Sequence, residues 1–202
     1  MPFFSDTGPD GFQPKRAFRF LVTFTELTDL TFMVKTAKKP SYALASTPHK
    51  ILNHTFNFPN TVVWDPISIT FIDAVDPNVG SKFYSALLNA GYLPPATSGD
   101  LLTGVTKVGA LGALGEVRIK QLDGGGVLLP TGADPGEVMT RTALSTMVLE
   151  EWTLKNAFLN KVEFGSSLSY AEEGLVEVSV GITYDFATFA AKPDGGKPYV
   201  KD

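Results

Sequence analysis

Two histidines are the first candidates for metal binding or acid–base chemistry in this sequence. His49 and His54 are five residues apart. On one strand this odd spacing places the side chains on opposite faces, and on a helix it is a poor match to a single face. A metal site would also need two further ligands, and no candidates are obvious. The spacing therefore indicates polar strand or interface histidines, and we expect no metal and no cofactor.

Two glutamate doublets, Glu150–Glu151 and Glu172–Glu173, are candidates for paired-carboxylate catalysis. Glycosidases need two carboxyl groups that face each other across the reacting bond, several Å apart. Neighbouring residues on a strand point to opposite faces, so neither doublet forms such a pair by itself. We interpret both doublets as solvated surface.

Glycines 109, 112 and 115 recur every three residues, which is not the G-x-G-x-x-G spacing of a dinucleotide-binding turn. No Lys-Ser or Lys-Thr pair makes the segment a phosphate-binding loop, and we predict an ordinary loop. The chain has no cysteine, which excludes thiolate nucleophiles, disulfides and cysteine-bound zinc. G-x-S-x-G and H-E-x-x-H are also missing. The sequence therefore predicts a structural or binding protein and no enzyme.

The amino-acid composition excludes further classes of protein. The chain has 202 residues, of which 44% are hydrophobic and 19% charged, enough for one domain with a real core. Its net charge of −4 argues against a protein that holds nucleic acid by neutralising phosphates. No secretory signal is visible, and no apolar run approaches the roughly 18 residues of a membrane helix, so we expect no membrane insertion.

Alternation of apolar and polar residues is the dominant pattern. It is clearest over 174–186, where Val178, Val180 and Ile182 share one side, and it recurs over 17–26. Such a period of two predicts strands with one buried face. Further strands are predicted at 30–37, 67–73, 115–122 and 147–154. The fold class that follows is mainly β, a sandwich or barrel.

One segment has a helical pattern instead. Asp76 is a suitable N-cap, Pro77 suits the first helical position, and Gly91 suits a left-handed C-cap. Between them, Phe83 and Leu87 follow the spacing of one helix face. We therefore predict one flanking helix at about 77–90.

The remaining segments lack periodicity. Residues 92–143 contain two stretches rich in Gly, Pro, Ala and Thr, which predict a long loop or insertion around the 115–122 strand. Residues 190–202 form a polar C-terminal tail. We treat 1–202 as a single domain.

The segment 31–76 resembles the tail tube proteins of contractile-tailed bacteriophages. The likeness begins with Val34-Lys35-Thr36-Ala37 and Pro40, followed by an extended arm at 42–60. It continues with Trp64-Asp65-Pro66-Ile67-Ser68-Ile69 and the acidic helix entry from Asp73 to Asp76. The stretch from Trp152 to Asp185 is similar to the end of such proteins, so the resemblance spans about 17–76 and 147–189.

The resemblance implies a small β-sandwich or barrel with one helix that oligomerises as a ring. Six copies would form the ring, and stacked rings would form the hollow virion tail tube, made in the host cytoplasm, through which genomic DNA passes during ejection. Its partners would be further copies of itself and the sheath, tube-initiator or baseplate, and terminator proteins. Type VI secretion and bacteriocin tube proteins share the fold.

Three alternatives stay open. The chain could form a single initiator or baseplate ring, or a ring of the type VI secretion kind. A β-sandwich ligand-binding or enzymatic domain is the third alternative. A carbohydrate binder would show exposed aromatic platforms, whereas Trp64 and Trp152, the two tryptophans, both lie in apolar strand contexts.

The arm is the predicted inter-subunit contact. Tyr42, Phe56 and Phe58 would leave a monomeric hairpin with much exposed apolar surface, which is typical of an interface. A self-packed loop is the alternative. Lys38 and Lys39 belong to the positive N-terminal part of the chain, which would attract the negative remainder of a neighbour in head-to-tail association.

The polar faces of the 17–26 and 174–186 strands are candidates for the channel wall. A conduit should not trap phosphates, so acidic and hydroxyl groups suit it better than lysine or arginine. We predict that one or both polar faces border the lumen and let DNA pass without specific binding; ordinary solvent exposure is the alternative. The residues concerned are Thr23, Glu177, Ser179, Thr183 and Asp185.

Overall fold

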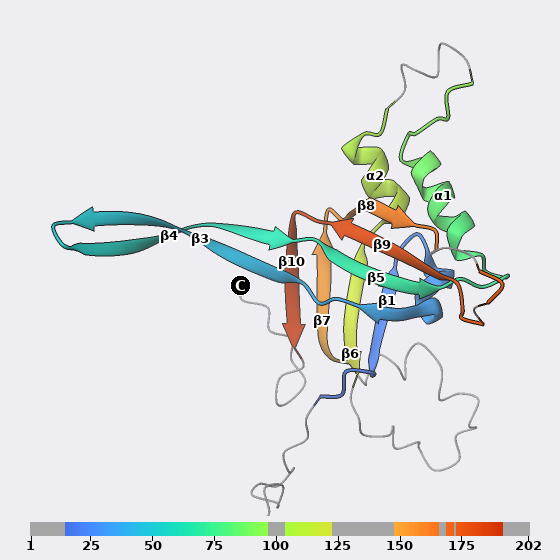
Figure 1. Ribbon diagram of the computed structural model, residues 1–202, viewed down its shortest axis with the longest axis horizontal. Coiled ribbons are helices and arrows are strands. Elements are labelled where there is room, and N and C mark those ends of the chain that lie inside the picture. The colour runs from blue at the N-terminus through green and yellow to red at the C-terminus, as the bar shows by residue number, and fades with distance from the viewer. Residues whose placement is uncertain (1–14, 97–103, 123–147, 166–168, 172, 192–202) are drawn as a thin grey trace, which may run out of the picture.

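The computed structural model describes residues 15–96, 104–122, 148–165, 169–171 and 173–191 (Figure 1). The elements in chain order are β1 (Phe20–Phe24), the 3-10 helix η1 (Thr28–Met33), β2 (Val34–Ala37), β3 (Ser41–Ile51), β4 (His54–Asp65), β5 (Ile67–Ile72), α1 (Val79–Asn89), α2 (Lys107–Leu114), β6 (Val117–Leu122), β7 (Val148–Lys155), β8 (Phe158–Glu163), β9 (Glu177–Thr183) and β10 (Phe186–Ala191).

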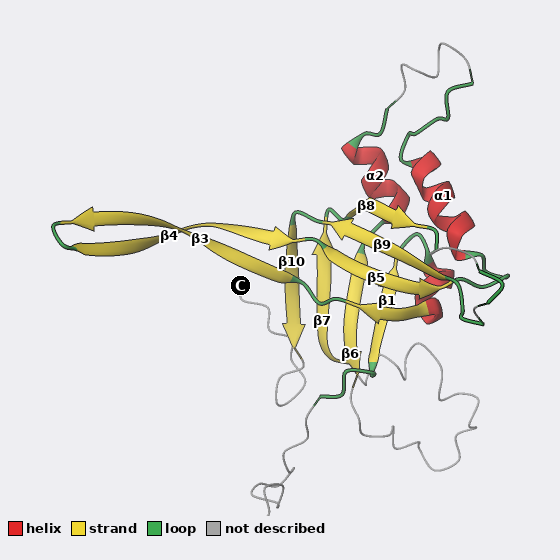
Figure 2. Ribbon diagram, in the orientation of Figure 1, coloured by secondary structure: helices red, strands yellow, loops and turns green. Residues whose placement is uncertain are grey.

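The strands form two four-stranded sheets and a separate hairpin. The first sheet has the order β1-β6-β7-β10, the second has the order β2-β5-β9-β8, and β3 pairs with β4. All neighbours are antiparallel. The strands of one sheet run across those of the other (Figure 2), which is the orthogonal mode of sheet packing. The predicted mainly β, sandwich-like fold is confirmed.

The core lies between the two sheets and follows the alternation in the sequence. Val22 and Phe24 of the first sheet are buried against Phe71 and Val180 of the second. The rings of Phe24 and Phe71 are 5.9 Å apart and join the sheets directly. Because every second residue points inward, each sheet leaves a polar face outside.

The strand predicted over 174–186 is divided between the sheets. β9 ends at Thr183 in the second sheet, and β10 begins at Phe186 in the first. The N–H of Asp185 donates to the carbonyl of Lys155 at 3.1 Å, and this hydrogen bond holds the point at which the chain crosses from the second sheet to the first. Alternation alone could not show this break, because Tyr184 remains buried, like the inward residues of a continuous strand.

The strand predicted over 30–37 is shorter than expected. Residues Thr28–Met33 form the 3-10 helix, and the strand begins at Val34. The hydroxyl of Thr31 donates to the carbonyl of Thr28 at 2.9 Å, a local bond that competes with strand pairing. Leu30 still reaches the core, which explains why its apolar character looked strand-like.

Helix α1 begins two residues later than predicted. The N-cap is Asn78, whose side-chain oxygen accepts from the N–H of Ser81 at 2.6 Å. Asp76 and Pro77 therefore precede the cap, and the predicted start was wrong. The predicted left-handed end is confirmed by Gly91, whose φ is 107°. Phe83 packs edge-on against Phe71 at 5.1 Å and joins the helix to the core.

A second helix, α2, occupies a segment for which we predicted a loop. Thr106 caps it by accepting from the N–H of Gly109 at 3.1 Å. A Cβ at Gly109 would lie 2.6 Å from the carbonyl oxygen of Ala90, so glycine permits the close approach of the two helices. Within the described residues, two α-helices thus flank the sandwich instead of the one predicted. The predicted loop at 123–143 lies outside the described residues, as does the tail beyond Ala191.

The corrected N-cap can be tested with a matched pair of variants. Asn78→Ala removes the acceptor for an orphan N–H and is expected to cost about 1 kcal/mol of unfolding free energy in urea denaturation. Asp76→Ala is the control and is expected to change stability by less than about 0.5 kcal/mol. A larger loss from Asp76→Ala than from Asn78→Ala would restore the original cap assignment.

Candidate functional site

The hairpin of β3 and β4, called the arm, leaves the sandwich on one side (Figure 1). With 11 residues in β3, it extends about 35 Å at roughly 3.3 Å per residue. All residues from 42 to 63 are exposed in the single chain. A two-stranded hairpin without a covering partner is marginally stable in water. The arm is therefore the first candidate for an intermolecular contact.

The outer half of the arm is amphipathic. Register pairs His49 with Phe56 and Ile51 with His54, so these four side chains share one face together with Phe58. The opposite face carries polar side chains such as Lys50 and Thr55. The expectation that the histidines lie on opposite faces was wrong, because a turn separates them and they stand on different strands.

Aromatic packing holds the root of the arm to the sandwich. The ring of Tyr42 lies 5.3 Å from that of Trp64, and Trp64 lies 5.9 Å from the buried Tyr184. The N–H of Lys38 donates to the carbonyl of Ser68 at 3.0 Å. Among the predicted contact residues, Tyr42 and Lys38 thus lie at the root, whereas Phe56 and Phe58 lie on the outer arm.

Glu150 is a buried carboxylate beside this root. Its exposed fraction is 6%, and it binds both Lys39 and Lys15. The prediction of a solvated glutamate doublet was wrong for this residue, because the inward face of β7 carries it into a cationic pocket. Glu151 lies on the outward face, 3.5 Å from Arg118. In the other doublet Glu173 is exposed, and residue 172 lies outside the described part.

The pKa of Glu150 lies below its usual value of 4.5. Burial opposes the charged form, but hydrogen bonds from Lys15 and Lys39 outweigh it. A carboxyl group with a lowered pKa stabilises the fold above its unfolded pKa and loses that contribution as the pH falls through the folded pKa. Acid below about pH 4.5 should therefore loosen the contact between the arm root and β7.

The outer face of the second sheet is rich in hydroxyl groups. The hydroxyls of Thr70 and Ser179 lie 3.4 Å apart, and Asn160 donates to Thr183 at 2.8 Å. A Cβ at Gly181 would lie 2.3 Å from the amide oxygen of Asn160, so glycine makes room for that side chain. The result is a surface of short polar side chains.

The lysines that flank this hydroxyl surface are paired with carboxylates. Lys35 binds Glu177, and Lys161 lies 2.6 Å from Glu163. Asp185, in the turn after β9, accepts from Lys107 at 2.7 Å. That hydrogen bond lowers the pKa of Asp185 below its usual value of 3.8. Paired lysines attract phosphates less than free ones do.

The outer face of the first sheet has a different character. Thr23 pairs with Arg118, which is also paired with Thr153 of β7. Arg118 and Lys120 lie 3.5 and 3.6 Å from Glu151. Because the two outer faces of a sandwich point in opposite directions, Thr23 lies on the other side of the subunit from Glu177, Ser179 and Thr183.

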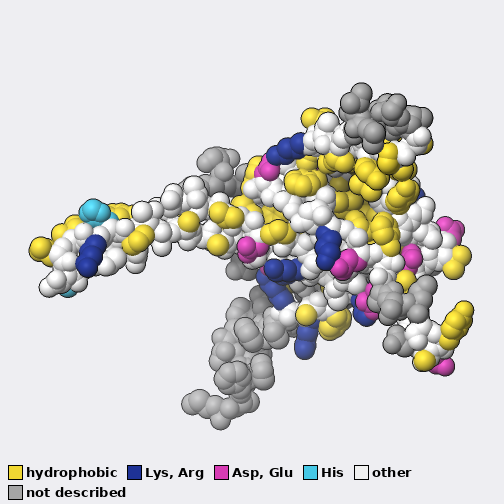
Figure 3. All heavy atoms as spheres, turned by 45° about the horizontal axis from the view of Figure 1, so that its top comes forward, with side chains coloured by type: hydrophobic (Ala, Val, Ile, Leu, Met, Phe, Trp, Pro, Cys, Tyr) yellow, Lys and Arg dark blue, Asp and Glu magenta, His cyan; other side chains and the backbone are white. Residues whose placement is uncertain are grey.

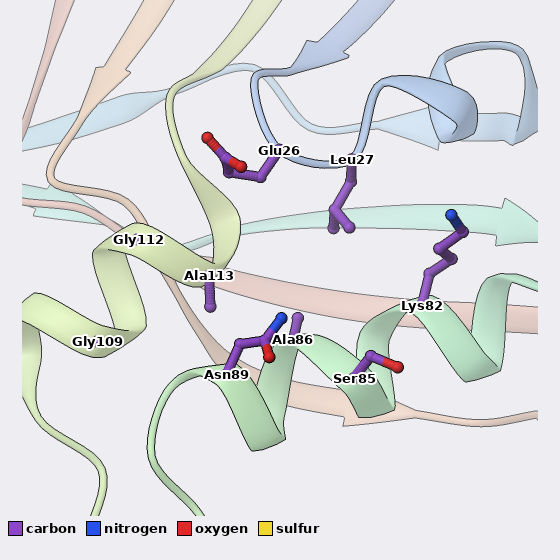
Figure 4. Close-up of a pocket in the computed structure, with 9 residues that line it drawn as sticks. All are labelled: Glu26, Leu27, Lys82, Ser85, Ala86, Asn89, Gly109, Gly112 and Ala113. Carbon is purple, nitrogen blue, oxygen red and sulfur yellow. The ribbon is translucent and has the colours of Figure 1, made fainter.

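A groove of about 480 Å³ lies between α1, α2 and the loop after β1 (Figure 4). Small residues line it on the α2 side, where Gly109, Gly112 and Ala113 stand opposite α1. Glu26 and Lys82 contribute the charged groups of its lining. In the space-filling view hydrophobic side chains gather over this helical end of the molecule and along the arm (Figure 3).

The described residues contain no group of three or more His, Cys, Asp or Glu side chains placed to hold a metal ion. Within the same part of the chain, no helix has the length and apolar character needed to cross a membrane. The candidate sites described above are the arm, the two outer sheet faces and the interhelical groove.

No protein family model and no curated protein matches the sequence. Solved structures do match. A chain of an extracellular contractile injection system, PVC, from its sheath/tube terminator in the extended state, is similar with a TM-score of 0.57 and 12% identity, over 89% of this chain and 99% of that chain. A chain of the anti-feeding prophage baseplate has a TM-score of 0.56 and 11% identity, over 88% and 96%.

A third match is the tube-terminating cap of the anti-feeding prophage, with a TM-score of 0.56 and 15% identity, over 89% of this chain and 93% of that chain. At such identities the likeness shows the fold. The chain has the fold of tube, terminator and baseplate components of contractile injection systems, and the resemblance inferred from the sequence is confirmed at this level.

The role of Glu150 at the arm root can be tested by pH-dependent unfolding. Glu150→Gln is expected to lower the unfolding free energy by about 1–2 kcal/mol at pH 7. The expected loss is smaller than for a fully buried ion pair, because both lysines are about half exposed and solvent screens their charges. The deficit should shrink in acid, because the wild-type carboxylate also loses its charge as the pH falls below 4.5 and through its lowered pKa.

Glu151→Gln is the matched control, since its partners lie on the exposed outer face. It is expected to lower the unfolding free energy by less than about 0.5 kcal/mol, both at pH 7 and in acid. A deficit in Glu150→Gln that does not change with pH would show that packing, and not charge, sets the effect.

Proposed function

We propose that this chain is the structural subunit of a tail tube in a contractile phage or a related injection particle. Identical copies form hexameric rings, the rings stack into a hollow tube, and the tube is a passive conduit for DNA. The subunit performs no reaction. Sheath, baseplate and terminator proteins are its partners at the outside and the ends of the tube, and the virion tail is its location.

The arm is the observation that carries this proposal. It is a long hairpin with an apolar face that its own chain leaves exposed, and it is attached to a sandwich with the tube-associated fold. An exposed apolar surface of this kind is stabilised by association. The anti-feeding prophage baseplate, with the same fold, is described as 6-fold symmetrised, which supports a ring of six.

The outer face of the second sheet is the better candidate for the lumen. It carries Glu177, Ser179 and Thr183 of the predicted wall, and its lysines Lys35 and Lys161 are paired with carboxylates. Short hydroxyl side chains interact weakly with a moving phosphate chain. Thr23, on the opposite outer face, then lies away from the channel, and Asp185 lies at the edge of the lumen face.

A single terminator or initiator ring is the second candidate. It is favoured by the three matching structures described above, which come from a sheath/tube terminator, a tube-terminating cap and a baseplate. Such a ring would share the fold and the lumen but would cap a tube instead of extending it. The two functions differ in one observable property, which is whether rings of this protein stack on one another.

Purified protein is expected to form hollow tubes at high concentration, because each stacked ring covers the arms of the next. Size-exclusion chromatography and negative-stain electron microscopy check this. Single rings that never stack would support the terminator or initiator. A protein that stays monomeric at millimolar concentration would contradict both functions.

The lumen assignment predicts a gain of DNA binding. In tubes of Ser179→Lys, each subunit adds one positive charge to the proposed channel, so short DNA should be retained inside, protected from nuclease, and released as salt rises. Wild-type and Ser179→Gln tubes should retain little. The measurement is the amount of nuclease-resistant DNA as a function of salt concentration.

Thr153→Lys places the same charge on the outer face of the first sheet and is the control for position. Its tubes are expected to leave any bound DNA open to nuclease. Protection by Thr153→Lys and none by Ser179→Lys would assign the lumen to the first sheet.

A further inference from the structure

The groove between α1 and α2 has a floor of small residues that the described part of the chain leaves open. Gly109 is pressed against the carbonyl of Ala90, but a Cβ at Gly112 would meet nothing within 4 Å. Ala86 and Ala113 complete the small-residue lining. Leu27 is apolar, whereas Ser85, Asn89, Glu26 and Lys82 form a polar rim. A groove of about 480 Å³ with a small-residue floor and a polar rim has room for a few aliphatic side chains and a charged group from another molecule.

The tip of the arm presents such side chains. Leu52 is 88% exposed and Ile51 is 51% exposed. Leu52 has a φ of 52°, in the left-handed region, and stands in the turn between β3 and β4. Within the described residues neither side chain belongs to the core. The tip is thus an apolar knob at the end of a hairpin about 35 Å long.

The arm tip and the groove carry complementary charges. Lys50 is next to the knob and Glu26 lines the groove, and neither makes an ion pair with the described residues. Lys82, which lines the groove as well, is already bound to Asp29 at 3.1 Å. A lysine that arrives with the knob would therefore find a free carboxylate at the groove.

The tip and the groove lie at opposite ends of the molecule (Figure 1). One chain therefore cannot insert its own tip into its own groove. Two different surfaces at opposite ends make a heterologous contact, which continues from copy to copy instead of closing in a two-fold dimer. This is the geometry that a growing assembly requires.

We propose that the groove between α1 and α2 is the seat for the arm tip of another copy of this chain, with Ile51 and Leu52 on the small-residue floor and Lys50 paired with Glu26. The contact rests on the proposed tube function and specifies which surface of the neighbour receives the arm. The occupant is a second copy because the same sequence supplies both the knob and the opposite charge.

Disulfide trapping tests the contact directly, since the chain has no cysteine of its own. In the double variant Leu52→Cys, Gly112→Cys each copy carries both partners, and Gly112 has room for a side chain. Oxidised assemblies are expected to give a ladder of covalent multimers on a non-reducing gel. The control pair is Leu52→Cys with Gly174→Cys, where the glycine also has open space but lies outside the groove, and it should give no ladder.

A charge exchange keeps the proposal testable if the cysteine variant fails to assemble. Lys50→Glu and Glu26→Lys, each alone, place like charges at the contact and are expected to raise the protein concentration needed for assembly about tenfold. The double exchange restores the pair and should return that concentration to within about twofold of wild type.

The outcomes separate the contact from the proposed function. A ladder confined to the Gly112 pair, or rescue by the double exchange, supports the seat. If the wild-type protein forms tubes but the cysteine variant gives no ladder and the double charge exchange gives no rescue, the proposed arm–groove contact is wrong and the tube function stands. A wild-type chain that never assembles overturns both.

Discussion

The arm depends on contacts that its own chain supplies only at the root. Beyond that root, about ten residues of each strand run without a core, and their aromatic face is open to water. A two-stranded ribbon gains little from its backbone hydrogen bonds in water, so its stability must come from packing. The stack of Tyr42, Trp64 and Tyr184 holds the base of the arm. Under the proposed function a neighbouring copy covers the remainder, and assembly then follows from the way the subunit is built.

The sandwich gives this arm a rigid platform and two chemically different outer faces. One face carries hydroxyls, a glycine and paired lysines; the other carries closely spaced arginine, lysine and glutamate side chains. Both faces carry polar side chains because the alternation of the strands turns core side chains such as Val22, Phe71 and Val180 inward between the sheets. A wall with a passage on one side and protein partners on the other needs this difference, since a sliding polyanion and a docking protein place opposite demands on surface charge.

Ion pairs connect the root of the arm to the sandwich. The carboxylate of Glu150 joins the arm root, through Lys39, to the segment before β1, through Lys15. The lysines of the hydroxyl face are likewise matched with acids, Lys35 of β2 with Glu177 of β9 and Lys161 with Glu163 of the same strand. Close pairing keeps the surface cations from acting as phosphate sites, which is consistent with the acidic net charge of the whole chain.

The sequence by itself determined the strands, the core side of each and the presence of an arm, because side chains on a strand alternate strictly and burial follows that alternation. Val22, Phe71 and Val180 could be assigned to the core in this way. Tertiary structure alone decided the rest. The crossing at Asp185 depends on a carbonyl 30 residues away in Lys155, and α2 packs against the end of α1 where Gly109 meets the carbonyl of Ala90. Glu150 is buried because two lysines distant in the chain reach it, and the histidines share a face because a turn lies between them. Each of these features depends on contacts between segments far apart in the chain, or across a turn, and a local pattern carries no information about such contacts.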